Sequence, residues 1–146
     1  MKKTLATVSL VLVLVSLSYA WGAAAKSEDK SQPLLSHSVY FSLKESTPEA
    51  QQKLVDACKK HLSQHPGVRY FATGTLCDEI KGGLNDRDFD VLLMMVFNDH
   101  EALHTYAQSA AHQKFIAENA ASFKKVRVFD ADVSRVAVPD DAQAAR

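Results

Sequence analysis

The sequence predicts an α+β domain of the order β-α-β-β-α-β, a ferredoxin-like arrangement with a four-stranded antiparallel sheet and helices on one face. Two observations support it. Strand-type alternation and helix-type spacing follow each other in this order within residues 35–133, and the third strand is apolar on both sides. The other segments lack the pattern, and we interpret residues 1–20 as a signal peptide, 21–34 as a flexible leader and 134–146 as a loose tail.

The first half of the domain is defined by its periodicity. Residues 37–43 alternate polar and apolar side chains, as a half-buried strand does. Residues 46–49 (STPE) are typical of a helix start, with a hydroxyl cap, an early proline and an acidic first turn. Apolar residues then recur at helical spacing until residues 65–67 (HPG) end the helix. Residues 68–77 predict the second strand.

The third strand is the basis for predicting a homodimer. Residues 78–88 are polar and predict a loop in which Arg87 pairs with neighbouring acids. Residues 89–97 then predict a strand that is largely apolar on both faces, whereas a sheet with one face in water shows one polar face. In a chain this short, the expected cover for the second face is another copy of the same sheet. The sequence therefore predicts a homodimer through the open sheet face.

Two helices and a strand complete the pattern. Asn98 and Glu101 have the spacing of a capping box and begin the second helix, whose inner stripe includes Tyr106. A short helix follows, and its inner face is expected to carry His112, Phe115, Ile116 and Asn119. Residues 126–129 predict the last strand.

The N-terminal segment has the features of a cleavable secretory signal. Lys2 and Lys3 precede an apolar run at residues 5–17, and small residues ending at Ala20 and at Ala25 offer two cleavage sites. A membrane anchor is the alternative, but it needs about 20 apolar residues, more than this run provides. We therefore expect an exported protein, periplasmic or secreted, with no membrane attachment after cleavage.

Charge and cysteine content narrow the choice of partners. The chain has 17 basic and 17 acidic residues, and removing Lys2 and Lys3 leaves 15 against 17, a net charge of −2. Nucleic-acid partners usually need a basic excess, so none is expected. Cys58 lies in the first helix and Cys77 at the end of the second strand, and the helix and strand run back together from one turn. The rise per residue places the two sulfurs at levels that differ by well over ~10 Å, whereas a disulfide needs Cα atoms within ~7 Å, which argues against an internal disulfide. A bridge between two chains through Cys77 remains open.

Four segments together point to a family. They are residues 37–44 (HSVYFSLK), residues 85–91 (NDRDFDV), Tyr106 followed by His112, and residues 125–130 (KVRVFD). In order and spacing they resemble the stress-responsive A/B barrel domain (Dabb) family. The resemblance spans residues 35–133 and implies a dimeric α+β barrel. The family includes plant stress-induced proteins, bacterial proteins without an assigned role and a plant polyketide cyclase.

The resemblance to the cyclase can be carried to single residues. Its catalytic tyrosine and histidine fall on Tyr106 and His112, and a pocket histidine falls on His37. Two further pocket histidines fall on Val91 and Ser109, where this sequence departs from the cyclase. A neutral imidazole in such a pocket can take a proton from an activated carbon while a phenol donates to a carbonyl oxygen. The alternatives are core polar residues with local hydrogen-bond partners, or ligand binding without chemistry.

The expected pocket wall combines strand residues that face the helices with one residue of the short helix. Its members are His37, Val39, Phe41, Val91, Leu93 and Phe115. His100 and His104 lie one helical turn apart, a spacing that can hold a metal, but no third ligand is evident. We therefore expect a solvated helix surface there, and neither a metal nor another cofactor.

Two functions remain open at this stage. The first is an exported, non-enzymatic homodimer that binds a small hydrophobic molecule. The second is an enzyme, either cyclase-like or lyase-like through Tyr106 and His112, or related to the small monooxygenases that share the dimeric barrel. Export places the protein away from most pools of activated acyl substrates, which favours the first function.

Overall fold

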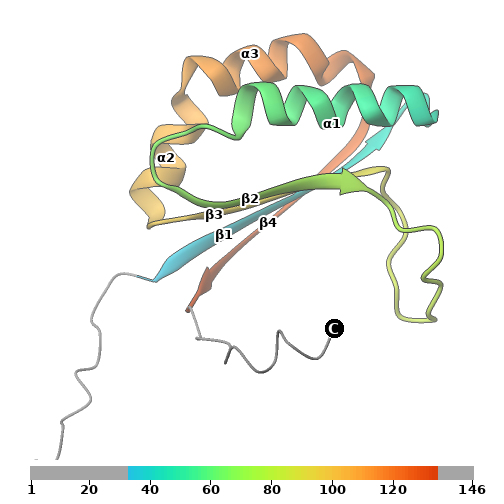
Figure 1. The fold of residues 1–146 in the computed structure, drawn as a ribbon, viewed down its shortest axis with the longest axis horizontal. Coiled ribbons are helices and arrows are strands. Elements are labelled where there is room, and N and C mark those ends of the chain that lie inside the picture. The colour runs from blue at the N-terminus through green and yellow to red at the C-terminus, as the bar shows by residue number, and fades with distance from the viewer. Residues whose placement is uncertain (1–32, 135–146) are drawn as a thin grey trace, which may run out of the picture. The chain divides into compact units, whose positions relative to one another are not determined.

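The computed structural model describes residues 33–134, in which a four-stranded antiparallel sheet carries helices on one face (Figure 1). The elements are β1 (Leu34–Leu43), α1 (Pro48–Leu62), β2 (Val68–Thr75), β3 (Val91–Phe97), α2 (His100–Gln108), α3 (Ala110–Asn119), a 3-10 turn (Ala120–Ser122) and β4 (Phe123–Val133). This order confirms the predicted fold class. The signal peptide lies outside the described residues, as do nearly all of the predicted leader and tail.

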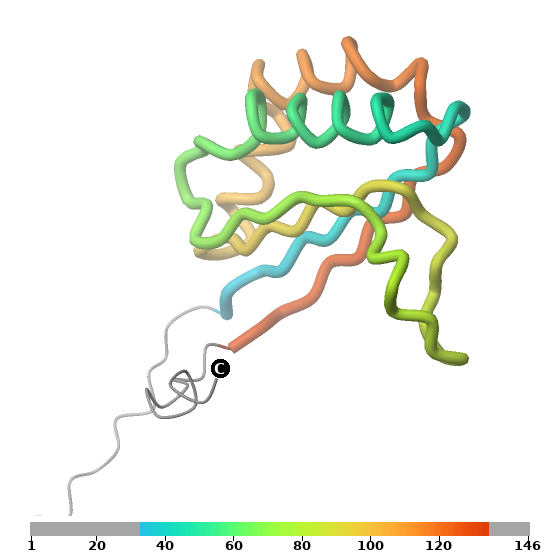
Figure 2. The backbone as a smooth tube through the Cα atoms, turned by 45° about the vertical axis from the view of Figure 1, so that its right-hand side comes forward, coloured from blue at the N-terminus to red at the C-terminus, as the bar shows by residue number. Residues whose placement is uncertain are grey.

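The sheet has the strand order β2-β3-β1-β4, so β1 and β3 occupy its centre. All three pairings are antiparallel. The helices pack above one face of this sheet, as both views of the backbone show (Figures 1 and 2). The core lies between these two layers. Its strand members are Leu35, Val39, Phe41, Leu43, Val91, Leu93, Met95 and Phe97, none of which is more than 6% exposed.

Helix α1 begins and ends as its sequence predicts. The Thr47 side chain accepts a hydrogen bond from the Ala50 amide at 3.2 Å, and Pro48 occupies the first turn. After the helix, Gly67 adopts a φ of 87°, and a Cβ there would approach the Cβ of Ala102 to 2.6 Å. Glycine is therefore required at this turn for both its backbone angle and its lack of a side chain. The buried face of α1 consists of Leu54, Val55, Cys58 and Leu62.

Several details differ from the sequence prediction, and two of them are strand ends, since β2 stops at Thr75 and β3 begins at Val91. The cap of α2 is Asp99 rather than Asn98, because the helix begins one residue later and the Asp99 carboxylate accepts from the Ala102 amide at 2.8 Å. Ile116 is 39% exposed, because the buried face of α3 follows the i, i+4 pair Phe115 and Asn119. Strand β4 runs well beyond residues 126–129, because it pairs along the whole length of β1.

The open face of the sheet, on the side away from the helices, is largely apolar. Its members alternate with the core residues of the same strands and include Tyr40, Tyr70, Ala72, Leu92, Met94, Val96 and Phe129. Tyr70 is 52% exposed and Phe129 is 54% exposed, while the residues of β3 on this face are half-buried. The prediction that β3 is apolar on both sides is therefore confirmed.

Neither cysteine forms a disulfide within the chain. Cys58 is buried and Cys77 is exposed. Burial raises the pKa of the Cys58 thiol to about 12, so this group stays protonated and unreactive. Within the described part of the chain, no helix combines the length and apolar character needed to cross a membrane.

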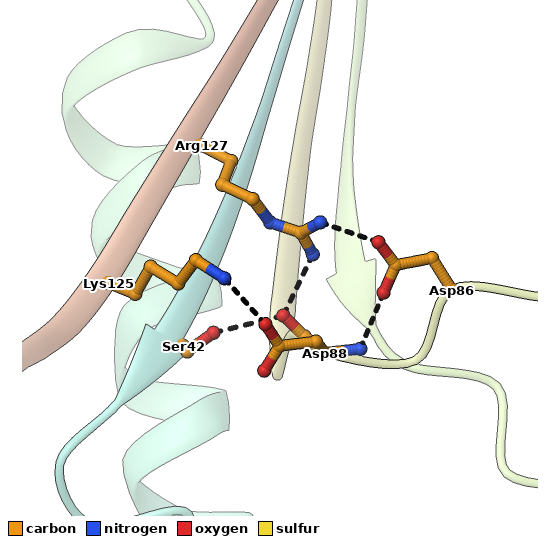
Figure 3. A network of polar contacts seen from close by, with 5 residues as sticks. All are labelled: Ser42, Asp86, Asp88, Lys125 and Arg127. Carbon is orange, nitrogen blue, oxygen red and sulfur yellow. Dashed lines mark hydrogen bonds and ion pairs between the residues drawn. The ribbon is translucent and has the colours of Figure 1, made fainter.

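The loop between β2 and β3 is tied to the rest of the domain by ion pairs. Arg87 donates to the carbonyls of Cys77 and Ile80 and pairs with Asp78, all at 2.8 Å. The prediction that Arg87 pairs with the acids beside it in the sequence is therefore wrong, because Asp86 and Asp88 are taken by residues of β4. At the end of the loop, the side chains of Arg127 and Lys125 on β4 reach Asp86 and Asp88 (Figure 3). The loop is thus anchored across the width of the sheet.

This anchor predicts a specific dependence of stability on pH. The hydrogen bond from Arg127 holds the pKa of Asp86 below its usual value of 3.8. Such a carboxylate stabilises the folded state above the unfolded pKa, and this contribution is lost as the pH falls through the lower, folded pKa. We therefore expect Asp86→Asn to lower the urea midpoint at pH 7 and expect its difference from the wild type to shrink below about pH 3.8.

The matched control is Asp56→Asn, because Asp56 makes only local contacts on the exposed surface of α1, an ion pair with Lys59 at 3.8 Å and a hydrogen bond from Gln52 at 2.9 Å. That variant should denature like the wild type at every pH. A difference for Asp86→Asn that stays constant from pH 7 to pH 3 would contradict the assigned role of the ion pair.

Candidate functional site

A buried tyrosine on α2 stands at the centre of the candidate site. Tyr106 is 2% exposed and packs against Phe97 of β3, with 5.2 Å between ring centroids. Three imidazoles surround it, those of His112, His65 and His37, at centroid distances of 4.8, 5.4 and 6.0 Å. We call Tyr106, His37, His65 and His112 the Tyr–His cluster. It lies between the helices and the sheet, which is where the sequence predicted a site.

The short connection between α2 and α3 places the His112 ring against the Tyr106 ring. Ser109 serves both helices, since its amide donates to the Tyr106 carbonyl at 3.0 Å and its hydroxyl accepts from the His112 amide at 3.2 Å. A single extended residue therefore separates the two helices, and His112 falls in the first turn of α3. Ser109 stands where the cyclase has a pocket histidine, and here it caps a helix.

The protonation states of His112 and Tyr106 follow from their surroundings. The Nδ1 atom of His112 lies 3.0 Å from the Ala107 carbonyl, which can only accept, so Nδ1 carries the proton and Nε2 of the neutral ring is an acceptor. Burial lowers the pKa of His112, and the nearby His37 and His65 lower it further, against a smaller opposing effect of the Ala107 hydrogen bond. Burial also raises the pKa of Tyr106. At neutral pH the cluster combines a basic nitrogen with a phenol that keeps its proton.

His37 is held by a carboxylate on the neighbouring strand. It lies directly opposite Asp130 in the β1–β4 pairing, and its Nδ1 is 2.7 Å from the Asp130 Oδ1. A second histidine–aspartate contact lies two residues further along β4, where the His100 Nε2 is 2.5 Å from the Asp132 Oδ1. His100 is thus engaged at the exposed edge, away from the Tyr–His cluster, and His104 is exposed. Within residues 33–134 no three His, Cys, Asp or Glu side chains are grouped to hold a metal ion.

The apolar residues expected to form the pocket wall all belong to the core beside the cluster. Val39, Phe41, Val91, Leu93 and Phe115 are at most 5% exposed. Three hollows are described in residues 33–134, and none of them is lined by Tyr106 or His112. Within the cluster Tyr106 is buried, whereas His37, His65 and His112 are each half-buried.

Sequence reasoning missed two members of the site. His65 was interpreted only as part of the turn that ends α1, and its contact with Tyr106 depends on how α1 and α2 pack. Asp130 follows Val126 and Val128 at the strand period, so alternation could have placed it on the helix side of β4. Its pairing with His37 follows from the antiparallel register, which no local pattern in the sequence specifies.

The fold and the cluster together define a class: ferredoxin-like α+β domains with a polar cluster between the helices and the sheet. Residues 35–133 match the family model described as the stress responsive A/B barrel domain. The chain belongs to this Dabb family. The match covers the whole of the described domain except its outermost residues.

Solved structures share this fold at low sequence identity. A Dabb family protein from Mesorhizobium loti is 24% identical, with a TM-score of 0.58 over 68% of this chain and 96% of that one. A dimeric ferredoxin-like protein of unknown function from Thermobifida fusca is 16% identical, with a TM-score of 0.58 over 70% and 92%. The hydroxynitrile lyase of Passiflora edulis is 14% identical, with a TM-score of 0.58 over 73% and 98%. No curated protein matches the chain.

Proposed function

We propose that this protein is an exported homodimer that binds a small, mostly apolar molecule at the Tyr–His cluster. The observation that carries the proposal is the meeting of one phenol and three imidazoles at the boundary between the buried core and solvent. Binding sites for small molecules are concave and mostly apolar with a few convergent polar groups; the cluster has this composition, although none of the three hollows described in residues 33–134 is lined by Tyr106 or His112.

The chemistry of the cluster narrows the class of ligand. The Tyr106 hydroxyl keeps its proton and can donate, while Nε2 of His112 can accept. The adjoining core side chains, including Phe97 and Phe41, offer only apolar surface. We therefore infer a ligand with an apolar body, a carbonyl oxygen for the phenol and a hydroxyl for the imidazole.

The dimer is supported by the open face of the sheet. Apolar side chains dominate this face, and Tyr70 and Phe129 are more than half exposed in the single chain. Contiguous exposed apolar surface of this kind marks an interaction site. The T. fusca protein of the same fold is described as dimeric. Face-to-face packing of two such sheets would bury the apolar face of both copies.

Acid–base catalysis at the same cluster is the second candidate. Burial keeps His112 neutral, and its Nδ1 proton is committed to the Ala107 carbonyl, so Nε2 is available as a base. The fold is shared with a hydroxynitrile lyase, whose sequence is 14% identical. In this role His112 would take a proton from the substrate and Tyr106 would donate a hydrogen bond to the oxygen on which negative charge develops.

The binding proposal is tested by native mass spectrometry of protein recovered from the exported fraction of cells that express the whole chain. The wild type, incubated with a metabolite extract, should retain a small molecule, and His112→Ala should lose it. His100→Ala is the matched control, because His100 pairs with Asp132 at the exposed edge. The chain mass also reports cleavage after Ala20 or Ala25.

Two results would count against the proposal. One is retention by His112→Ala equal to that of the wild type, and the other is the absence of any retained compound in all three proteins. Conversion of the retained compound by the wild type, lost in Tyr106→Phe, would favour the catalytic candidate. An uncleaved chain held inside the cell would contradict export.

A further inference from the structure

A second candidate site lies on the open face of the sheet, on the side opposite the Tyr–His cluster. It is a hollow of about 460 Å³ lined by Tyr40, Asp86, Phe89, Leu92, Arg127 and Phe129. The loop between β2 and β3 projects beyond the sheet on the side away from the helices and supplies one wall (Figures 1 and 2). The volume lies within the range of small-molecule sites, about 300–1,000 Å³.

Three aromatic rings form the apolar part of the hollow. The ring of Tyr40 lies edge-to-face with Phe89, at 4.9 Å and 80°, and with Phe129, at 5.6 Å and 85°. Phe129 is 54% exposed, so much of its surface remains without a partner in the single chain. Aromatic groups favour edge-to-face and offset contacts, and these three rings offer both edges and faces to a further flat ring.

The polar residues at and beside the hollow are joined by ion pairs of balanced charge (Figure 3). The Arg127 guanidinium donates to Asp86 at 2.5 Å and to the Asp88 carbonyl at 2.8 Å, while Lys125 pairs with Asp88 at 2.7 Å. Two basic and two acidic side chains leave no net charge, which disfavours an ionic ligand. The guanidinium has five N–H donors and a carboxylate has about four lone pairs, so both Arg127 and Asp86 retain hydrogen-bonding capacity.

We propose that this hollow binds a neutral phenol of one or two fused rings. Its ring would pack among Tyr40, Phe89 and Phe129. Its hydroxyl can both accept from Arg127 and donate to Asp86, which favours a phenol over a plain aromatic hydrocarbon. One chain supplies every wall of the hollow, so the site does not depend on the ligand proposed for the Tyr–His cluster. In the proposed dimer it faces the space between the two sheets.

The test is calorimetric titration of the mature protein with 2-naphthol. The wild type should bind one equivalent per chain, and Phe129→Ala should weaken binding about tenfold, the loss expected for one aromatic contact. Tyr70→Ala is the matched control, because Tyr70 is an equally exposed aromatic residue of the same face that does not line the hollow. Circular dichroism establishes that each variant is folded.

Met94→Asp separates this proposal from the proposed dimer, because Met94 lies on the open face outside the hollow. Binding to the wild type that depends on Phe129 supports the site, whatever the mass of the protein. Binding to a monomeric Met94→Asp but not to the wild type means that the partner's side chains fill the hollow, and it overturns the proposal. Absence of saturable binding to both proteins, or equal weakening in Phe129→Ala and Tyr70→Ala, also overturns it.

Discussion

Met94→Asp is expected to give a folded monomer, whereas Met95→Asp is expected to unfold the chain. The two residues are neighbours in β3 and point to opposite faces of the sheet. Met95 is 0% exposed in the core, where an unpaired carboxylate has no compensating partner. Its burial costs several kcal/mol, a large part of the ~5–15 kcal/mol that stabilises a domain of this size.

Met94 differs because its face of the sheet would be covered only in the proposed dimer. In the single chain it is half-buried on the open face, so an aspartate there keeps much of its hydration. In the dimer the same aspartate would be enclosed between two apolar sheets, which favours dissociation. Sedimentation velocity and circular dichroism of both variants check this, with Met94→Leu as the conservative control. A Met94→Asp protein that stays dimeric, or that unfolds as Met95→Asp does, would contradict the proposed interface.

Phe115→Ala is expected to lower the free energy of unfolding by about 3–5 kcal/mol, the usual cost of deleting a buried aromatic side chain. Phe115 is 2% exposed and connects α3 to the sheet through Phe41 and Phe123, at ring-centroid distances of 6.2 and 6.4 Å. The loss combines the apolar surface returned to water on unfolding with the cavity left in the core. Because α3 carries His112, the same change should loosen the Tyr–His cluster.

The neighbouring residue provides the control for that change. Ile116 is 39% exposed, so Ile116→Ala should cost under about 1 kcal/mol. Urea denaturation of the two variants and the wild type measures both values. If Ile116→Ala were as destabilising as Phe115→Ala, the buried face of α3 would be the one expected from the sequence and not the one that the structure shows.

The fold could be predicted because its signals are local. The alternation in residues 37–43, the Thr47–Pro48 helix start and the two apolar faces of β3 each depend on residues close together in the chain. The errors arose where tertiary packing decides. β4 extends because β1 offers a full-length partner, and Ile116 turns outward because Phe115 and Asn119 occupy the contact with the core.

The candidate site likewise has residues that could be predicted from the sequence and residues that could not. The inward orientation of Tyr106, His112 and His37 was predicted from the periodicity of their helices and strand, and the resemblance to a family cyclase implied that all three are site residues. His65 and Asp130 join them only through long-range packing and strand register, as the pairing of His37 with Asp130 across the sheet shows. The hollow on the open face was missed for the same reason, because ion pairs between the loop and β4 set its walls.

The most direct test of the proposed homodimer is sedimentation equilibrium of residues 21–146 at micromolar concentration. The apolar open face predicts a species of twice the chain mass, and the mass should stay constant as the protein is diluted through that range. A single-chain mass at every concentration would contradict the packing of two sheets face to face. It would leave the open face, with Tyr70 and Phe129 more than half exposed, without its proposed cover.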